Sequence, residues 1–380
     1  MELLLSEDQE LLAKTANDFV AEHSPVSRMR KLRDTKDPVG FSRALWKQMA
    51  ELGWVGIPFP ESVGGAGLGF AELAPVLEAL GRKLAPEPFL STVLLGGQAV
   101  LLGGNESQQK EWLAPLVNGD CILTLAHQEA KSRYDLARVT TRAEKAGDGW
   151  RLTGEKVQVL DGHVADAFVV AARTSGGTTD AKGVTLFLVR GGAKGLDVTR
   201  QSRVDARNAA ILKLSGVTVG AGDALGSVDE GFALLERVVD RAMVGLCAEM
   251  LGSMQQAADD TFQHLKTRVQ FGVPIGSFQA LKHRAARMYI ELELSRSTVM
   301  AAARAVDENA ADLPKLASLV KARCSEAGIQ IANEAIQMFG GVGMTDEYDI
   351  GFYLKRARVA EITFGDAAFH RDRWARLSGY

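Results

Sequence analysis

The spacing of apolar residues changes twice along the chain. From residue 6 to about 120 the apolar residues recur with the period of an amphipathic helix. From about 121 to 225 they alternate in short runs bounded by glycine and aspartate, as strands do, and from about 229 to 376 helical spacing returns. The pattern predicts an α+β protein with a helical domain over 1–120, a β-barrel-like domain over 121–228 and a four-helix-bundle-like domain over 229–380.

The first region contains clear helix signals. Helices are predicted over 8–22, 41–52 and 70–84, separated by segments rich in proline and glycine. Ser6 and Gln9 have the spacing of a capping box, in which each side chain accepts a hydrogen bond from the other residue's backbone N–H. The glycines between 64 and 69 lack the full GxGxxG spacing and follow no strand, so we interpret them as a loop between helices.

The other two regions contain strand runs and long apolar stripes. Strands are predicted in the runs 150–152, 156–160, 168–172 and 184–189, with a hairpin turn at Gly147-Asp-Gly149. The later stripes are long enough for helices packed as an up-and-down bundle. Their members are Phe232, Leu235, Val239, Ala242, Leu246 and Met250, and then Leu281, Ala285, Met288 and Leu292.

Composition narrows the class of protein. A net charge of -3, with 24% charged residues of mixed sign, suggests neither a nucleic-acid footprint nor a basic membrane surface. Cys121, Cys247 and Cys324 stand far apart, which favours reduced thiols over disulfides or a zinc site, and no metal-ligating pattern occurs. The N-terminus lacks the basic segment of a signal peptide, and no apolar run reaches the roughly 18 residues of a membrane span. We therefore expect a cytoplasmic protein without a metal site.

Two segments of the last region carry candidate chemistry. The segment 268–279, RVQFGVPIGSFQ, joins two helices and places a guanidinium, an aromatic ring and an amide around a turn. Arginine there could grip a pyrophosphate, although a charged helix-end turn is the simpler interpretation. In 336–344, IQMFGGVGM, paired glycines allow a ligand to approach the backbone closely, and a glycine helix cap is the alternative.

Taken in this order, the segments resemble the acyl-CoA dehydrogenase family over essentially the whole chain. The similar stretches are ELGWVGIPFPESVGGAG, GDGWRLTGEK, RVQFG, QMFGGVGM and the closing FGD. Details such as SRYDL, LKTRVQFGVPIGSFQALKHRAA and TFGDA look most like the small subunit of pimeloyl-CoA dehydrogenase-type enzymes. The resemblance implies α,β-dehydrogenation of an acyl-CoA thioester with FAD, and an electron-transfer flavoprotein as the acceptor.

The resemblance also implies a cofactor role for one set of residues. In the family, the matching residues reach across a dimer interface to the pyrophosphate and adenosine of the neighbouring subunit's FAD. They are Arg268, Phe271, Gln279, Gln337, Gly340 and Gly341.

The residues that the family uses for its chemistry are altered. The reaction needs a carboxylate that removes the substrate's α-proton while a hydride passes to FAD. The usual glutamate position falls on Phe364, and the relocated position in the first long C-terminal helix falls on Ala242. The family's Trp-x-Thr-Asn-Gly, which flanks the flavin ring, aligns with 158–162, QVLDG, and its Gly-Ser-Asp turn aligns with 133–135, RYD.

Two catalytic hypotheses follow, with a third from another class. The chain is either one half of a heteromer (a heterotetramer) whose homologous large subunit supplies the base and the ring pocket, or a self-sufficient enzyme with a displaced base, which would be a homo-oligomer. Asp366 is the candidate base, with helix capping or a cofactor hydrogen bond as its alternative role. Glu249 lies about 10 Å along the helix from Ala242, and a buried salt bridge is its simpler role. A non-catalytic acyl-CoA- or flavin-binding paralogue remains the third hypothesis.

The acyl group is not defined by these residues. The subfamily resemblance implies degradation of a fatty or dicarboxylic acid through a pimeloyl-like thioester. Lys131 and Arg133 are candidate cations for a distal carboxylate, and exposed loop residues are the simpler interpretation.

Overall fold

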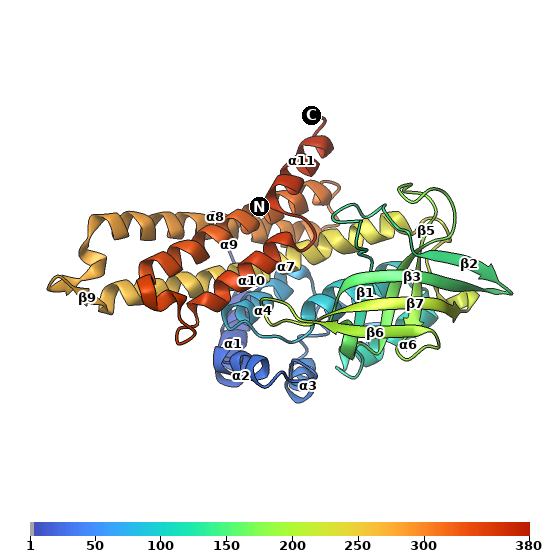
Figure 1. The fold of residues 1–380 in the computed structure, drawn as a ribbon, viewed down its shortest axis with the longest axis horizontal. Coiled ribbons are helices and arrows are strands. Elements are labelled where there is room, and N and C mark those ends of the chain that lie inside the picture. Colours follow the sequence, from blue (N-terminus) through green and yellow to red (C-terminus); the bar gives the residue numbers. More distant parts are fainter. Residues whose placement is uncertain (1–3) are drawn as a thin grey trace. The chain divides into compact units, whose positions relative to one another are not determined.

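A computed structural model describes residues 4–380, which divide into two compact units. The helical unit contains the described part of Met1–Asp34 together with Gly69–Ala85 and Met243–Tyr380. The sheet unit contains Thr35–Leu68 and Pro86–Ala242. Figure 1 shows the order of helices, sheet and helices along the chain that the apolar pattern predicts.

The helical unit is built from long helices that bury one face each. Helix α9 packs against α8, α10 and α11, while α4 packs against α1 and α8. Two short strands form a hairpin between α7 and α8 (Figure 1). The elements are α1 (Glu7–His23), α2 (Val26–Asp34), α4 (Phe70–Arg82), α7 (Gly231–Thr267), which enters this unit at Met243, β9 (Val269–Gln270), β10 (Val273–Pro274), α8 (Gln279–Asp307), α9 (Leu313–Phe339), α10 (Ile350–Ile362) and α11 (Ala367–Leu377).

Several local expectations hold in this unit. The Ser6 hydroxyl accepts from the Gln9 backbone N–H at 3.2 Å, and the Ser6 N–H donates to the Gln9 amide oxygen at 3.1 Å, which forms the capping box. Helix α9 ends at Phe339, where Gly340 adopts a φ of 70°.

Helix α2 was not predicted, because its sequence VSRMRKLRD is too polar to show an apolar stripe.

The sheet unit contains one eight-stranded sheet in the order β6-β7-β3-β2-β4-β5-β8, with β1 pairing parallel to β4. Short helices accompany the sheet, and the first residues of α7 belong to this unit. The strands are β1 (Leu123–Ala126), β2 (Arg142–Ala146), β3 (Gly149–Leu160), β4 (Ala167–Arg173), β5 (Val184–Arg190), β6 (Leu196–Gln201), β7 (Ala209–Val219) and β8 (Ala224–Leu225). The helices are α3 (Arg43–Glu51), α5 (Gln98–Gly103) and α6 (Glu106–Val117), with a π-helical segment at Phe89–Gly97.

Strand β3 differs from the sequence prediction. The two predicted runs, 150–152 and 156–160, belong to a single strand whose pairing with β7 shifts register twice. Each shift interrupts the alternation of side chains between the two faces, so the pattern appears broken where the strand is continuous. The predicted hairpin turn is present between β2 and β3, with Gly147 at a φ of 65°.

Helices α4 and α7 approach each other at two glycines. A Cβ added at Gly81 would lie 1.9 Å from the Glu249 carbonyl oxygen, and one added at Gly252 would lie 1.8 Å from the Glu78 carbonyl oxygen. No side chain fits at either position without separating the helices. The contact between α4 and α7 therefore depends on both glycines.

We predict that Gly252→Ala lowers the free energy of unfolding by about 3 kcal/mol or more, because the added methyl group forces α4 away from α7. Gly328→Ala is the matched control, since it also lies inside a helix but its Cβ would meet only side-chain atoms at ordinary contact distances, the nearest being the Met250 methyl group at 3.6 Å. The control should be neutral or stabilising by about 0.5–1 kcal/mol. Urea denaturation of both variants measures the difference, and equal effects would contradict the prediction.

Candidate functional site

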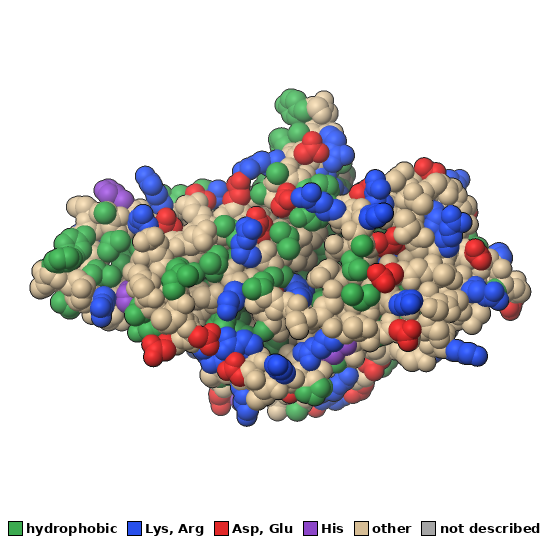
Figure 2. Space-filling model, in the orientation of Figure 1, with side chains coloured by type: hydrophobic (Ala, Val, Ile, Leu, Met, Phe, Trp, Pro, Cys, Tyr) green, Lys and Arg blue, Asp and Glu red, His purple; other side chains and the backbone are tan. Residues whose placement is uncertain are grey.

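The hairpin between α7 and α8 presents an aromatic ring to solvent. Its two turn residues, Phe271 and Gly272, both have positive φ, at 54° and 80°. The Phe271 side chain is 94% exposed and contacts Phe278 edge to face, with 6.2 Å between ring centroids. A bulky aromatic residue gains nothing from this position within the monomer. Figure 2 shows hydrophobic side chains gathered at the end of the helices that carries this hairpin.

The end of α9 lies beside the end of α7. The ring of His264, in the last turn of α7, stacks on Phe339, the last residue of α9, with 4.3 Å between centroids. Arg268 follows His264 by one turn and donates its backbone N–H to the His264 carbonyl oxygen at 2.9 Å. The Arg268 guanidinium and the glycine pair after Phe339 therefore belong to neighbouring helix ends.

The glycine pair leaves the backbone uncovered. A Cβ built on Gly340 or Gly341 has no atom within 4 Å, and both glycines are exposed, as is the preceding amide side chain of Gln337. Gln279, the first residue of α8, is exposed as well. All six residues expected to contact FAD thus belong to the exposed hairpin or to the helix ends next to it.

Charged residues hold the segment that follows these glycines. Arg30 and Arg33 of α2 form ion pairs of 2.7 Å with Asp349 and Asp346, respectively. Both guanidiniums also lie over the ring of Phe352, at 4.6 and 4.9 Å from its centroid. Such a network of charges and a ring orders a loop better than an isolated surface ion pair does.

These residues fit the diphosphate and adenosine half of FAD. The pyrophosphate needs cationic and N–H donors, which an exposed guanidinium, an amide and bare glycine backbone supply. The adenine needs a flat apolar surface, which Phe271 offers. None of these groups is covered by the rest of the helical unit, so the cofactor's tail would meet them from outside.

The turn between α10 and α11 contains the position where the family resemblance expects the base. Phe364 has a φ of 64°, Gly365 has a φ of 129°, and the Phe364 side chain is half-buried. The Asp366 carboxylate accepts the backbone N–H of Phe369 at 2.9 Å and caps α11. The carboxylate of the candidate base is thus engaged in the capping role that was its alternative interpretation.

The other carboxylate considered from the sequence has a buried partner. Glu249 forms a bidentate ion pair with Arg356 of α10, at 2.9 and 3.1 Å, and both residues are buried. Ala242, where the family resemblance expects the relocated base, is fully buried within the sheet unit and carries no proton acceptor on its side chain. The simpler interpretation of Glu249, a salt bridge inside the bundle, describes this contact.

In the sheet unit, residues of the segment 158–162, which is expected to flank the flavin ring, form hydrogen bonds within the protein. Gln158 has a φ of 54° at the second register shift of β3, and its N–H donates to the Gln201 side chain at 3.2 Å. Asp161 is buried, and its carboxylate accepts the Ser91 hydroxyl at 2.6 Å. Burial raises the pKa of Asp161, although the Ser91 bond opposes the shift. These contacts offer no sign of a fit to the flavin ring.

A buried ion pair connects the loop between β1 and β2 to β3. Lys156 donates to Glu129 at 2.7 Å, and Glu129 also accepts from Thr141. Burial alone would raise the pKa of Glu129, but Lys156 and the hydrogen bonds lower it to about 2. Arg133 and Lys131, the candidate cations for a distal carboxylate, lie exposed just after Glu129.

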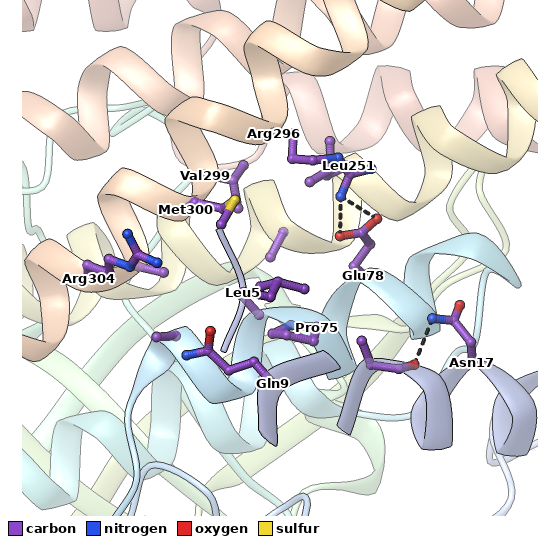
Figure 3. A pocket seen from close by; sticks show the side chains of 15 residues that line it. Leu5, Gln9, Asn17, Pro75, Glu78, Leu251, Arg296, Val299, Met300 and Arg304 are labelled. Atoms are coloured by element: carbon purple, nitrogen blue, oxygen red, sulfur yellow. Dashed lines mark hydrogen bonds and ion pairs between the residues drawn. The ribbon is translucent and has the colours of Figure 1, made fainter. Parts of the chain in front are cut away.

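A separate pocket lies inside the helical unit, between α1, α4, α7 and α8 (Figure 3). Its volume is about 180 Å³, and Leu251, Val299 and Met300 line it together with several alanines. Arg296 at its edge pairs with Glu78 at 2.9 Å. None of the candidate FAD or catalytic residues lines this pocket.

The described residues were also searched for membrane spans, metal-ligand clusters and disulfides. Within 4–380, no helix is long and apolar enough to cross a membrane. No group of histidine, cysteine and acidic side chains in that range could hold a metal ion. All three cysteines are buried and free.

The sequence analysis did not single out one buried charged residue, Lys321. Lys321 lies on the buried face of α9 and is fully buried. The signal was present, because a lysine at an apolar position of a helical stripe requires buried acceptors. The sequence did not reveal that two of those acceptors are the backbone carbonyls of Glu361 and Gly365, on either side of Phe364.

Comparison with known proteins gives the family. Three family models match: the acyl-CoA dehydrogenase N-terminal domain at 6–120, the middle domain at 124–216 and the C-terminal domain at 229–378. The chain belongs to the acyl-CoA dehydrogenase family, whose members are FAD-dependent oxidoreductases that dehydrogenate acyl-CoA thioesters.

Individual relatives are similar over nearly their full length. Acyl-CoA dehydrogenase FadE27 of Mycobacterium tuberculosis is 33% identical over 88% of both chains. A chain from the ChsE4-ChsE5 complex of the same organism is 31% identical, with a TM-score of 0.89, covering 100% of this chain and 99% of that one. A chain of the Tcur3481-Tcur3483 steroid ACAD is 32% identical, with a TM-score of 0.88 over 98% of both chains.

His370, which supports the Phe364 turn, should make stability depend on pH. Burial, aided by Lys321 and Arg373, lowers the pKa of His370 from 6.5 to about 3. The unfolded chain therefore binds the proton first as pH falls, so this contribution is complete above pH 6.5 and is lost towards pH 3.

We expect the His370 contribution to fall by about 2 kcal/mol between pH 7 and pH 5. His370→Gln should remove that part of the pH dependence, whereas His283→Gln, at an exposed position of α8, should leave it unchanged. Urea unfolding at both pH values measures it. A wild-type slope in His370→Gln would show that His370 titrates normally.

Proposed function

We propose that this chain is one subunit of a heteromeric acyl-CoA dehydrogenase. It supplies the FAD-tail side of a site whose base and flavin-ring pocket belong to a homologous subunit. The observation that carries the proposal is an asymmetry: the groups suited to a partner's cofactor are intact and exposed, while both usual base positions hold Phe364 and Ala242. The relatives in complexes named for two proteins support this assembly.

The chain's own residues would act by binding and orientation. FAD, when bound, supplies the acceptor for the substrate's β-hydride. Arg268 and Gln337 would bind the diphosphate, and the backbone of Gly340 and Gly341 would let it approach closely. Phe271 would pack against the adenine and exclude water from it. The base that removes the α-proton would come from the partner subunit.

A self-sufficient enzyme is the second candidate. It would need Asp366 as the base, but that carboxylate caps α11, and Glu249 is held by Arg356. A non-catalytic binding module would keep the same exposed groups without turnover. An adjacent gene for a paralogue with the glutamate and tryptophan positions intact would favour the heteromer over both.

The acyl group and the electron acceptor are also proposals. The resemblance to pimeloyl-CoA dehydrogenase suggests a dicarboxyl thioester, whereas the relative described as a steroid ACAD suggests a larger polycyclic one. Both classes belong in a substrate panel. An electron-transfer flavoprotein is the acceptor that the family resemblance implies.

Flavin content and flavin reduction test the assembly. The chain is purified alone and together with its paralogue, and flavin per subunit is measured before acyl-CoAs are added. We expect little flavin on the isolated chain, and absorbance bleaching only in the complex, because the ring pocket and base belong to the partner. One flavin per subunit and bleaching with the chain alone would sink the heteromer proposal, and Asp366→Asn would then show whether Asp366 is the base.

Removing the Arg268 guanidinium should weaken retention of FAD by the complex. Arg268→Met deletes a charged donor to the pyrophosphate, and the expected loss of affinity is roughly tenfold or more. Arg151→Met, at an exposed position of β3, is the control and should retain FAD normally. Flavin release in a dilution assay measures both, and equal retention would exclude the pyrophosphate role of Arg268.

A further inference from the structure

Lys321 is a buried cation at the centre of the helical unit. It lies on α9, is 0% exposed, and its ammonium group has three N–H donors. The three bonds go to neutral oxygens: the Ser325 hydroxyl at 2.9 Å and the backbone carbonyls of Glu361 and Gly365, each at 2.7 Å. Every donor is used, which is what allows a lysine to be buried at this position.

The two carbonyls belong to the two ends of one turn. Glu361 lies in the last turn of α10, where carbonyl oxygens lack partners within the helix. Gly365 directly precedes Asp366, the cap of α11. A single ammonium group on α9 therefore ties the end of one helix to the start of the next. The negative end of the α10 dipole favours a cation at this point.

The turn needs such a restraint because its backbone is strained. Phe364 has a φ of 64°, a left-handed conformation that is unfavourable for a residue with a side chain. The His370 ring lies 3.2 Å from the Phe364 carbonyl oxygen and, through its other nitrogen, 3.5 Å from the Ser318 hydroxyl of α9, so it links the turn to α9 through a side chain of α11. Lys321 bonds the backbone of the turn to α9 directly, with no residue between them.

We propose that Lys321 is a positioning residue that fixes the turn 363–366, and with it residue 364, against α9. Position 364 is where the family resemblance places the catalytic glutamate. Lys321 therefore supports the turn at which the family resemblance places the base, although Phe364 itself carries no carboxylate. This inference goes beyond the proposed function, because the contacts lie within one chain and require neither partner nor cofactor.

The charge on Lys321 is consistent with this role. Burial lowers the pKa of Lys321 to about 8, while surrounding groups, including Cys247 and Asp366, act in the opposite direction. Below that value the ammonium form, with all three donors, predominates. A neutral amine would leave one of the three oxygens without a donor.

Hydrogen exchange of the isolated full-length chain tests the proposal. In Lys321→Met, peptides that cover 362–370 should exchange about tenfold faster or more, because two carbonyls lose charge-assisted bonds. Peptides from α4 and α8 should exchange as in the wild type. Lys315→Met, the same change on the same helix, is the matched control and should leave the turn protected.

Local and global effects are separated by the unfolding midpoint in urea. A local rise in exchange with a midpoint close to that of the wild type supports positioning. Unchanged exchange at 362–370, or an equal rise throughout the helical unit, overturns it. If Lys321→Met does not fold, Lys321→Gln decides: exchange faster than in the wild type at the turn supports the proposal, and wild-type exchange there overturns it.

The same variant keeps this inference distinct from the heteromer proposal. In the assembled complex, Lys321→Met should leave turnover unchanged if the partner supplies the base. A loss of turnover together with faster exchange would support the positioning role and contradict the heteromer proposal. The exchange measurement needs no flavin, so its failure leaves the heteromer proposal standing.

Discussion

Backbone contact between α4 and α7 is the constraint on which the helical unit depends. Gly81 and Gly252 let two helices far apart in sequence touch without side chains between them. This close contact fixes the position of α7 relative to α4. Glu249 lies on α7, three residues before Gly252, and forms its ion pair with Arg356 of α10. The cost of removing two charges from water is offset only when the two groups are held in good hydrogen-bonding geometry. The helix contact and the ion pair therefore stabilise each other.

The distribution of polar groups follows from this packing. Inside the helical unit, the carboxylates of Glu249 and Asp366 are committed to an arginine and to a helix cap, and the ammonium of Lys321 is committed to backbone oxygens. At the hairpin end the situation is reversed, since Arg268 and the ring of Phe271 are exposed. Interior charges therefore maintain the fold, and the groups available for a ligand lie at the surface.

Much of the fold could be read from periodicity, because helices and strands expose different spacings of apolar residues. The prediction of secondary structure was weakest where a local feature interrupts the apolar periodicity. Strand β3 is bulged, and α2 is so polar that its partners, Asp346 and Asp349, are needed to hold it. The candidate FAD residues were identified from motifs around turns. The sequence pattern did not show that these turns are neighbours, a contact that the structure makes through the stacking of His264 on Phe339.

The sequence by itself determined the family and the order of helical and β regions, because these depend on residue identity and spacing; that Phe364 stands at the usual base position stays a prediction. Only the tertiary structure decided which charges are engaged. The sequence offers Asp366 as a candidate base and Glu249 as a more distant one, but it does not show that one caps a helix and the other is paired in the core. Lys321 shows the same limit, since two of its three partners are backbone oxygens brought to it by folding, and backbone groups carry no sequence signature.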